Sequence, residues 1–264
     1  MHILDALVLG IIQGLTEWLP ISSSGHLVIA EEALGLPAGK NLVFDLILHL
    51  GTLLAVVVFF RSELGRIVLS IVKPHPAKGS QEEKLRLLGA LLLIGTIPAA
   101  VAGVLFKDSI EKVFDIRYVG LALIVNAIML FSFERYWAKG TRKDAKLLDA
   151  ILIGLFQAVA IIPGISRSGS TLGGGMVRGL ERETAAVFAF LLSVPTLVGA
   201  FVYGFLTLNK FDTELTSSLV GFGAAFLVGL VSIEYLLKAV RSGKLWVFSV
   251  YCAVIGATVA ILTL

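Results

Sequence analysis

The sequence predicts an all-α integral membrane protein built from six transmembrane helices and two re-entrant helical hairpins, arranged as an inverted internal repeat. The first observation is composition: the mean hydropathy is +0.92 and only 16% of the residues are charged, against about a quarter in soluble domains. The second is a set of long apolar stretches. The third is a motif that occurs twice at a fixed distance.

Six long apolar stretches predict transmembrane helices, because a helix needs about 20 residues to cross the hydrocarbon core. They cover residues 42 to 60, 87 to 106, 118 to 133, 184 to 208, 217 to 238 and 245 to 264. Two shorter stretches, 3 to 19 and 147 to 162, each run into a turn that contains Pro, Gly and Ser. The stretch 107 to 117 alternates charged and apolar residues and is expected to lie at the membrane interface.

A single offset of 144 residues aligns the two short stretches and their turns without a gap. Residues 4 to 27, LDALVLGIIQGLTEWLPISSSGHL, align with residues 148 to 171, LDAILIGLFQAVAIIPGISRSGST, and nine positions are identical. The identities include a glutamine and the pattern S-x-S-G. The chain is therefore predicted to be one membrane domain, residues 1 to 264, with repeats at about 1 to 133 and 147 to 264.

The distribution of Lys and Arg predicts how the repeats are oriented, because these residues gather in cytoplasmic loops. If the segments 3 to 36 and 147 to 180 each turn back to the side of the membrane from which they start, the second repeat is inverted. The loops then carry 16 Lys and Arg on one side and 5 on the other, Arg167 aside; if both segments cross fully, the division is 12 to 9. We therefore expect both termini outside and the loops 61 to 86 and 134 to 146 inside.

The two S-x-S-G turns are expected to face each other and to form the site. Inverted repeats with broken helices bring such segments together near the midplane, and irregular backbone there must be buried or line a wet cavity. The copies differ at three aligned positions: Glu17 aligns with Ile161, Ser23 with Arg167 and His26 with Ser170. The candidate substrate-binding residues are Gln13, Ser22, Ser24, Gly25, Ser166, Ser168, Gly169 and Thr171.

Arg167 is the most informative residue, because a guanidinium near the bilayer centre is costly and is retained where it has a partner. Its planar fork suits two oxygens of a phosphate group. Amides of glycine-rich turns at helix N-termini add to such an anion site. An internal ion pair with Glu17 is the alternative, and both arrangements can hold at different steps.

Each of the remaining candidates has more than one interpretation. Glu17 either coordinates a divalent cation that bridges phosphate oxygens or acts as a general base; a helix-end acid that reaches water is the structural alternative. His26 either moves protons near neutral pH or is an ordinary hydrogen-bonded residue. Ser23 is a nucleophile activated by His26 or only a hydrogen-bond donor. Asp45 and His49 share a helix face and either support the site or line its cavity.

Several function classes are excluded by the residues present. The sequence contains no metal-ligand cluster of Cys and His, no Walker loop and no nucleotide-binding glycine pattern after a strand. The net charge of +3 reflects the Lys and Arg of membrane loops rather than a nucleic-acid partner.

Two motifs resemble those of a known family. QGLTEWLPISSSGHL, residues 13 to 27, is similar to the [E/Q]xxxE and PxSSxGH signature of bacterial undecaprenyl pyrophosphate phosphatases, the bacitracin-resistance family. PGISRSGST, residues 163 to 171, is similar to the PGxSRSxxT signature of the same family. FDLILHLGTLLAVV (44 to 57) and FAFLLSVPT (188 to 196) also resemble its spans, so the resemblance covers essentially the whole chain.

The resemblance implies hydrolysis of a polyprenyl diphosphate to the monophosphate, which recycles the lipid carrier for peptidoglycan synthesis. It also implies dependence on a divalent cation, Mg²⁺ or Ca²⁺, and a multi-pass protein of the bacterial plasma membrane with an active site open to the outer face. Carried over by position, Glu17, Ser23, His26 and Arg167 are catalytic and Glu17 is the metal ligand. Gln13 stands where many members have Glu, which weakens the expectation of two carboxylates on one cation.

A flippase or ion-coupled carrier of polyprenyl phosphate is the second hypothesis. Secondary transporters share the plan of inverted repeats with broken helices, and fold alone does not choose between a carrier and an enzyme. The expected partners are the lipid substrate and membrane lipids, and a homodimer is compatible with the sequence.

Overall fold

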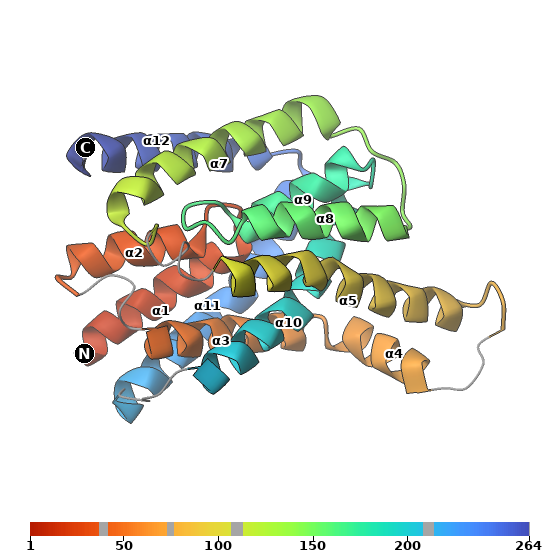
Figure 1. Cartoon of the computed structure of the whole chain (residues 1–264), viewed down its shortest axis with the longest axis horizontal. Helices are drawn as coiled ribbons and strands as arrows, with labels where there is room; N and C mark the ends of the chain where they lie inside the picture. Colours follow the sequence, from red (N-terminus) through yellow and green to blue (C-terminus); the bar gives the residue numbers. More distant parts are fainter. Residues whose placement is uncertain (37–41, 73–76, 107–112, 208–213, 264) are drawn as a thin grey trace.

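The computed structural model describes residues 1–36, 42–72, 77–106, 113–207 and 214–263. These residues form an all-helical fold with one isolated β-bridge between Arg142 and Leu180. The helices (Figure 1) are α1 (Ile3–Trp18), α2 (Ser23–Ala33), α3 (Leu42–Phe59), α4 (Arg61–Val72), α5 (Gln81–Leu105), α7 (Ile116–Trp137), α8 (Leu147–Val159), α9 (Arg167–Val177), α10 (Arg182–Thr207), α11 (Leu215–Arg241) and α12 (Leu245–Thr263).

Six helices are long and apolar enough to cross a membrane, as the sequence predicts. They are α3, α5, α7, α10, α11 and α12, and each coincides with one of the six apolar stretches. Helices α5 and α7 begin earlier than predicted, because their starts are fixed by the polar caps Ser80 and Asp115 rather than by hydropathy. Of the stretch 107 to 117, which was expected at the interface, residues 107–112 lie outside the described residues.

The predicted loop 61 to 86 is partly helical, which corrects the expectation. Residues Arg61–Val72 form α4, and α5 already begins at Gln81. Helix α4 packs against α5, where Ile67 lies against Gly89. A short helix is stabilised mainly by such packing of one face, which a search for long apolar stretches does not detect.

Two pairs of short helices contain the duplicated motif. In each pair the first helix, α1 or α8, ends before the turn, and the second, α2 or α9, starts inside the motif. Ser22 and Ser166 are the N-caps of α2 and α9, and their hydroxyls accept hydrogen bonds from the amides of Gly25 and Gly169. The two second helices therefore begin at positions that the offset of 144 aligns.

The short helices pack closely against long ones (Figure 1). Helix α1 lies along α11 and α8 lies along α5. A side chain on Gly10 or Gly14 would collide with α11 near Gly221 and Ala225, so small residues permit this approach, as is usual between membrane helices. Helix α7 packs along α12 and also contacts α2 and α9, so both turns lie against it.

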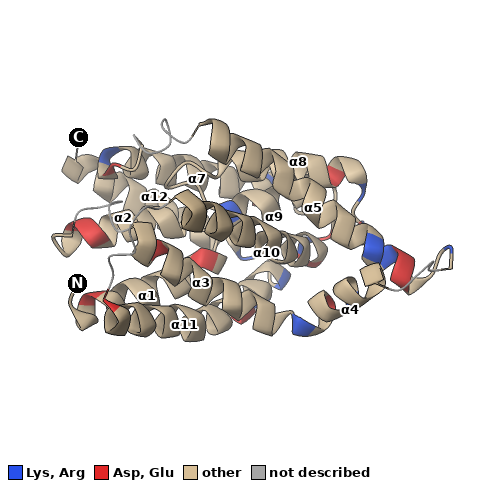
Figure 2. Cartoon of the chain, turned by 60° about the horizontal axis from the view of Figure 1, so that its bottom comes forward, with Lys and Arg blue, Asp and Glu red and all other residues tan. Residues whose placement is uncertain are grey.

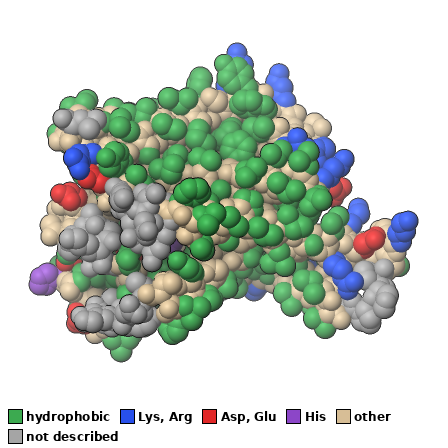
Figure 3. Space-filling view, viewed as in Figure 1, with side chains coloured by type: hydrophobic (Ala, Val, Ile, Leu, Met, Phe, Trp, Pro, Cys, Tyr) green, Lys and Arg blue, Asp and Glu red, His purple; other side chains and the backbone are tan. Residues whose placement is uncertain are grey.

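Lys and Arg residues are unevenly distributed between the two ends of the molecule. Figure 2 shows most Lys and Arg at the end opposite the two termini, and Figure 3 shows apolar side chains over the middle of one face. Apart from Arg117 and Arg167, the described Lys and Arg belong to the segments 61–86, 135–146, 178–182 and 238–244. The apolar middle and the six long helices make the chain a multi-pass membrane protein.

Candidate active site

The two turns contact each other, as the sequence predicts. The Ser22 hydroxyl accepts a hydrogen bond from the N–H of Gly164 at 3.1 Å, besides the bond from Gly25. In the other direction Ser168 donates its hydroxyl hydrogen to the carbonyl of Leu19 at 3.0 Å. Ser22 adopts a φ of 70°, which is uncommon outside glycine. The bonds between the turns therefore hold a backbone conformation that this residue rarely adopts alone.

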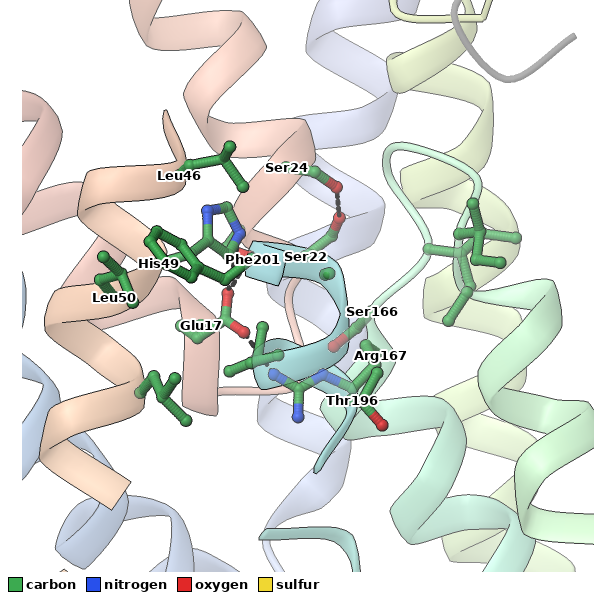
Figure 4. A pocket seen from close by; sticks show the side chains of 17 residues that line it. Glu17, Ser22, Ser24, Leu46, His49, Leu50, Ser166, Arg167, Thr196 and Phe201 are labelled. Atoms are coloured by element: carbon green, nitrogen blue, oxygen red, sulfur yellow. Dashed lines mark hydrogen bonds and ion pairs between the residues drawn. The ribbon is translucent and has the colours of Figure 1, made fainter. Parts of the chain in front are cut away.

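The carboxylate of Glu17 lies at the centre of the polar cluster (Figure 4). One oxygen forms an ion pair with Arg167 of the other turn. The second oxygen accepts hydrogen bonds from the Ser23 hydroxyl at 2.5 Å and from the Gln13 amide at 3.0 Å. Glu17 is only 6% exposed, so it is not a helix-end acid that reaches water. A buried carboxylate of this kind is stable only with its partners in place.

Arg167 is held between the carboxylate and an aromatic ring. Its guanidinium carbon lies 5.4 Å from the ring centroid of Trp18, a cation–π contact that restricts the side chain. Trp18 is fully buried and its ring packs against Phe190, with centroids 5.6 Å apart. The Arg167 side chain keeps 16% of its surface exposed, and this surface faces the cavity described below.

His49 of α3 also lies beside Glu17. Its Nε2 is 3.6 Å from Glu17 Oε2, and its Nδ1 is 2.7 Å from the carbonyl oxygen of Asp45. Because a carbonyl only accepts hydrogen bonds, Nδ1 carries a hydrogen and Nε2 faces the carboxylate. This histidine, which the sequence left as either a supporting or a lining residue, is thus close enough to interact with the centre of the cluster.

His26 points away from the cluster. Its Nδ1 lies 2.8 Å from the Ser22 carbonyl, and its Nε2 lies 2.9 Å from the hydroxyl of Tyr251 on α12, with the two rings stacked. Ser23 donates to Glu17 instead, so the structure does not contain the expected pair of Ser23 and His26. The reason is that the side of the first turn of α2 that carries His26 faces α12, whereas Ser23 lies on the side that faces Glu17. The catalytic role of His26 stays a prediction.

A cavity of about 330 Å³ opens beside the cluster. Helices α3 and α10 supply much of its apolar wall, including Leu46, Leu50, Leu197 and Phe201. Its polar wall includes the predicted residues Glu17, Ser22, Ser23, Ser24, Ser166 and Arg167. Helices α2 and α9 both begin at this cavity, so the positive ends of two helix dipoles add to the guanidinium. The polar wall is therefore suited to a strongly anionic group.

The other predicted residues lie behind the cavity wall. The backbone amides of Gly25 and Gly169 donate hydrogen bonds to the hydroxyls of the capping serines Ser22 and Ser166. Thr171 donates its hydroxyl hydrogen to the backbone carbonyl of Arg167 at 2.9 Å. Ser168 links the turns, as described above. These residues shape the turns from within, and none of them lines the cavity.

Gln13 is fully buried behind Glu17, and its amide nitrogen is also 3.4 Å from the hydroxyl of Thr52. The second copy has the same pairing, because Thr196 donates its hydroxyl hydrogen to Gln157 at 3.3 Å. Both pairs follow the offset of 144 residues. The duplicated motif thus maintains equivalent contacts in its two copies, although the chemistry of the copies differs.

A second cavity of about 340 Å³ adjoins the first. Ser24, Leu46 and His49 line both cavities. The second cavity continues to Thr207 at the C-terminal end of α10 and to Phe114 just before α7. Both chain termini lie at this end of the molecule (Figure 1), so the site connects to the end that carries few of the Lys and Arg that the structure describes (Figure 2).

Sequence reasoning missed three residues that hold the site. Trp18 supports Arg167, Tyr251 binds His26, and Asn126 of α7 binds both turns. A lone asparagine in an apolar span is a recognisable signal, since such residues are rare there and usually have a structural or functional partner. The contacts of the two aromatic residues depend on long-range packing and leave no local signal.

The residues near Glu17 suit a divalent cation that is shared with a ligand. Within the part of the chain that the structure describes, no three His, Cys, Asp or Glu side chains lie close enough to hold a metal ion. Glu17 offers one carboxylate, and Gln13 Oε1 is a buried acceptor with no hydrogen-bond partner. Mg²⁺ is commonly bound by one or two carboxylates plus substrate phosphates. The donor set thus fits a cation completed by phosphate, but not one held by the protein alone.

Comparisons with known proteins give a consistent picture. The family model described as bacitracin resistance protein BacA matches residues 6–258. Proteins named undecaprenyl-diphosphatase from Korarchaeum cryptofilum, Methanosphaera stadtmanae and Carboxydothermus hydrogenoformans are 40%, 38% and 40% identical to the chain. These alignments cover 99 to 100% of the chain and 98 to 100% of the three proteins.

Proposed function

The chain belongs to the bacitracin resistance protein BacA family, and on this premise we propose that it hydrolyses undecaprenyl diphosphate to undecaprenyl phosphate and inorganic phosphate. Relatives that match it over their whole length are named for this activity. The reaction recycles the lipid carrier used in peptidoglycan synthesis. The single observation that carries the proposal is the hydrogen bond from Ser23 to Glu17 beside Arg167.

The first step forms a bond between the Ser23 hydroxyl oxygen and the terminal phosphorus. Ser23 already donates its hydrogen to Glu17, so the carboxylate takes this proton as the oxygen attacks. The bond between the terminal phosphorus and the bridging oxygen breaks, and undecaprenyl phosphate leaves. Water then attacks the phosphorus of the phosphoserine, and the bond between that phosphorus and the Ser23 oxygen breaks. Glu17 returns its proton to this oxygen, one hydrogen of the water stays on the released phosphate, and the other passes to solvent.

Arg167 and the two helix N-termini stabilise the charge on the transferred group. The guanidinium binds two phosphate oxygens in a fork geometry. Ser23 and Ser24 at the start of α2 and Ser166 and Arg167 at the start of α9 line the same cavity, so the positive ends of both helix dipoles lie beside it. Positioning and charge stabilisation supply most of the rate enhancement in phosphoryl transfer, so an enzyme with this site needs few catalytic side chains.

The polyprenyl tail leaves the cavity along its apolar wall. Leu46 and Leu50 of α3 and Leu197 and Phe201 of α10 line this wall. The first isoprene units contact this wall, and the remaining chain extends into the surrounding lipid. The diphosphate reaches the site from the end of the molecule where the second cavity opens, and the released phosphate leaves by the same route.

We propose that the Glu17 carboxylate would hold a divalent cation, Mg²⁺ or Ca²⁺, when the diphosphate is bound. When bound, the cation neutralises phosphate charge and polarises the terminal phosphoryl group. Glu17 would be its carboxylate ligand, and Gln13, which is buried behind Glu17 and donates a hydrogen bond to it, would hold that carboxylate in place. With one carboxylate, the protein is expected to bind the cation weakly in the absence of substrate.

The chain is proposed to be an inverted repeat with two re-entrant hairpins, α1–α2 and α8–α9. The matched pairs of Gln13 with Thr52 and of Gln157 with Thr196 support the duplication. Helix α1 of the first half packs on α11 of the second, and α8 of the second half packs on α5 of the first. This reciprocal packing supports a two-fold relation between the halves. The basic end is the cytoplasmic one, which puts both termini and the cavity mouth on the outer face of a bacterial plasma membrane.

Phosphate release by the purified protein tests the function. Undecaprenyl diphosphate is incubated with the protein in detergent micelles with Mg²⁺, Ca²⁺ or EDTA, and inorganic phosphate is measured. Steady release with either cation and none from Arg167→Ala supports the proposal. No release with either cation, together with protein-dependent movement of polyprenyl phosphate between vesicle leaflets, would favour the carrier hypothesis. A carrier does not need a serine hydrogen-bonded to a buried carboxylate.

A further inference from the structure

Asn126 is the only polar side chain between Val119 and Phe131 of α7, and it is 1% exposed. We propose that it is a positioning residue: its amide sets the placement of Ser23 relative to Arg167 and thereby the rate of phosphoryl transfer. The inference rests on the proposed function, because the rate in question is that of the diphosphatase reaction.

Each end of the Asn126 amide binds a different turn. Nδ2 donates to the carbonyl of Pro20 at 3.0 Å, three residues before Ser23. Oδ1 accepts from the N–H of Ser166 at 3.1 Å, the residue immediately before Arg167. One planar group therefore ties the backbone beside the nucleophile and the backbone beside the guanidinium to the same point on α7.

Neither backbone group has a partner within its own helix. Ser166 is the N-cap of α9, and the N–H groups at a helix start have no intrahelical acceptor. The Pro20 carbonyl lies in the turn between α1 and α2. Inside a membrane protein such groups must be satisfied by other protein groups. A side-chain amide provides one donor end and one acceptor end at a fixed distance, which an apolar residue of similar size does not.

The rest of the second turn lies against the same face of α7, on both sides of Asn126 along the helix. A side chain at Gly164 would meet Ala122 and Val119, and one at Gly169 would meet Leu130. Asn126 lies between these contact points along α7. It is therefore placed to fix where each turn sits along the helix, while the surrounding van der Waals contacts fix how close the second turn approaches it.

Steady-state kinetics of Asn126→Leu test the proposal. A displacement of about 1 Å costs up to ~10²-fold in rate, so kcat and kcat/KM are expected to fall together by about 10²-fold while KM is unchanged. The matched control is Ser249→Ala. It removes another buried hydrogen bond, from the Ser249 hydroxyl to the carbonyl of Ala127 at 2.7 Å. This bond is made to α7 at the residue after Asn126 and involves neither turn. This control is expected to keep the wild-type kcat.

Three results would overturn the proposal. The first is an unchanged kcat in Asn126→Leu. The second is a loss of kcat in Ser249→Ala as large as that in Asn126→Leu at matched thermal stability, which would show a general packing effect. If the leucine variant does not fold, Asn126→Ala removes both bonds without adding bulk and carries the same expectation. The third is absence of phosphate release from the wild type, which refutes the proposed function, and the inference falls with it.

Discussion

Glu17 and Arg167 are 150 residues apart in the chain, and their side chains form an ion pair between the two turns. Both side chains are largely buried, with 4% and 16% of their surface exposed. Removing one partner from a buried pair leaves an uncompensated charge. In the resting protein each residue therefore stabilises the other. A bound diphosphate offers Arg167 a bidentate partner and frees the carboxylate to accept the proton of Ser23.

Arg167→Ala is expected to abolish phosphate release and to destabilise the fold by about 3 to 5 kcal/mol, because it leaves Glu17 buried without its cation. Adding Glu17→Gln removes the stranded charge. The double variant is therefore expected to recover most of the stability and none of the activity. Chemical unfolding in detergent micelles measures the stability of each variant, and phosphate release measures its activity. A double variant as unstable as Arg167→Ala would contradict the argument from the buried charge.

Ser23→Ala is expected to lower kcat by more than ~10²-fold, since it removes the attacking oxygen and leaves the charge-stabilising groups in place. Ser193→Ala is the control, because that hydroxyl is buried away from the site and donates to the Phe190 carbonyl of its own helix. Brief incubation of the wild type with substrate labelled in the terminal phosphate, followed by acid quenching, should leave label on Ser23. Full activity of Ser23→Ala would assign the attack to water.

Much of the fold is present in the sequence as long-range regularity. Six apolar stretches predict the six long helices, and the offset of 144 predicts that the two turns are equivalent and meet. The pairing of Glu17 with Arg167 was predictable as one of two alternatives, because a buried guanidinium requires an acid and the turns supply one. Hydropathy and the repeat were enough for these points, since burying polar groups in lipid is costly and limits where the turns and the charged residues can lie.

The orientation of individual side chains was not predictable. Ser23 and His26 lie three residues apart in α2 and share a motif, yet one binds Glu17 and the other binds Tyr251. Which side of a helical turn faces the cavity depends on how α2 packs against α7 and α12, and no local pattern encodes that packing. His49 reaches Glu17 for a similar reason: the close approach of α3 to α1 is a tertiary property.

His49→Gln is expected to lower kcat by roughly 10-fold or more, because His49 Nε2 lies 3.6 Å from the Glu17 carboxylate and a neutral amide neither takes nor gives a proton there. Thr207→Val, at the far end of the adjoining cavity, is the comparison and is expected to keep the wild-type kcat. The measurement is steady-state phosphate release at saturating substrate. Equal rates for His49→Gln and the wild type would restrict His49 to lining the cavity.

Gly164→Ala tests whether contact between the turns is needed for activity. Gly164 has a φ of +98°, and an added Cβ would lie 2.6 Å from the Cβ of Ala122 and 2.9 Å from the Val119 carbonyl oxygen. The substitution is therefore expected to push the turn away from α7 and to break the 3.1 Å bond to Ser22. Alanine at a positive φ destabilises a protein by more than about 1 kcal/mol, so we expect a lower free energy of unfolding and a loss of phosphate release.

The matched control is Gly103→Ala in α5, where an added Cβ would meet nothing within 4 Å. At such an open helical position the substitution is expected not to destabilise the fold, since alanine favours a helix over glycine by up to about 1 kcal/mol. Activity and unfolding are measured for both variants in the same detergent. If Gly164→Ala kept wild-type stability and rate, the turns would tolerate displacement. In that case the short distance between Arg167 and Glu17 would have to be maintained by the ion pair itself rather than by the backbone contacts around Ser22.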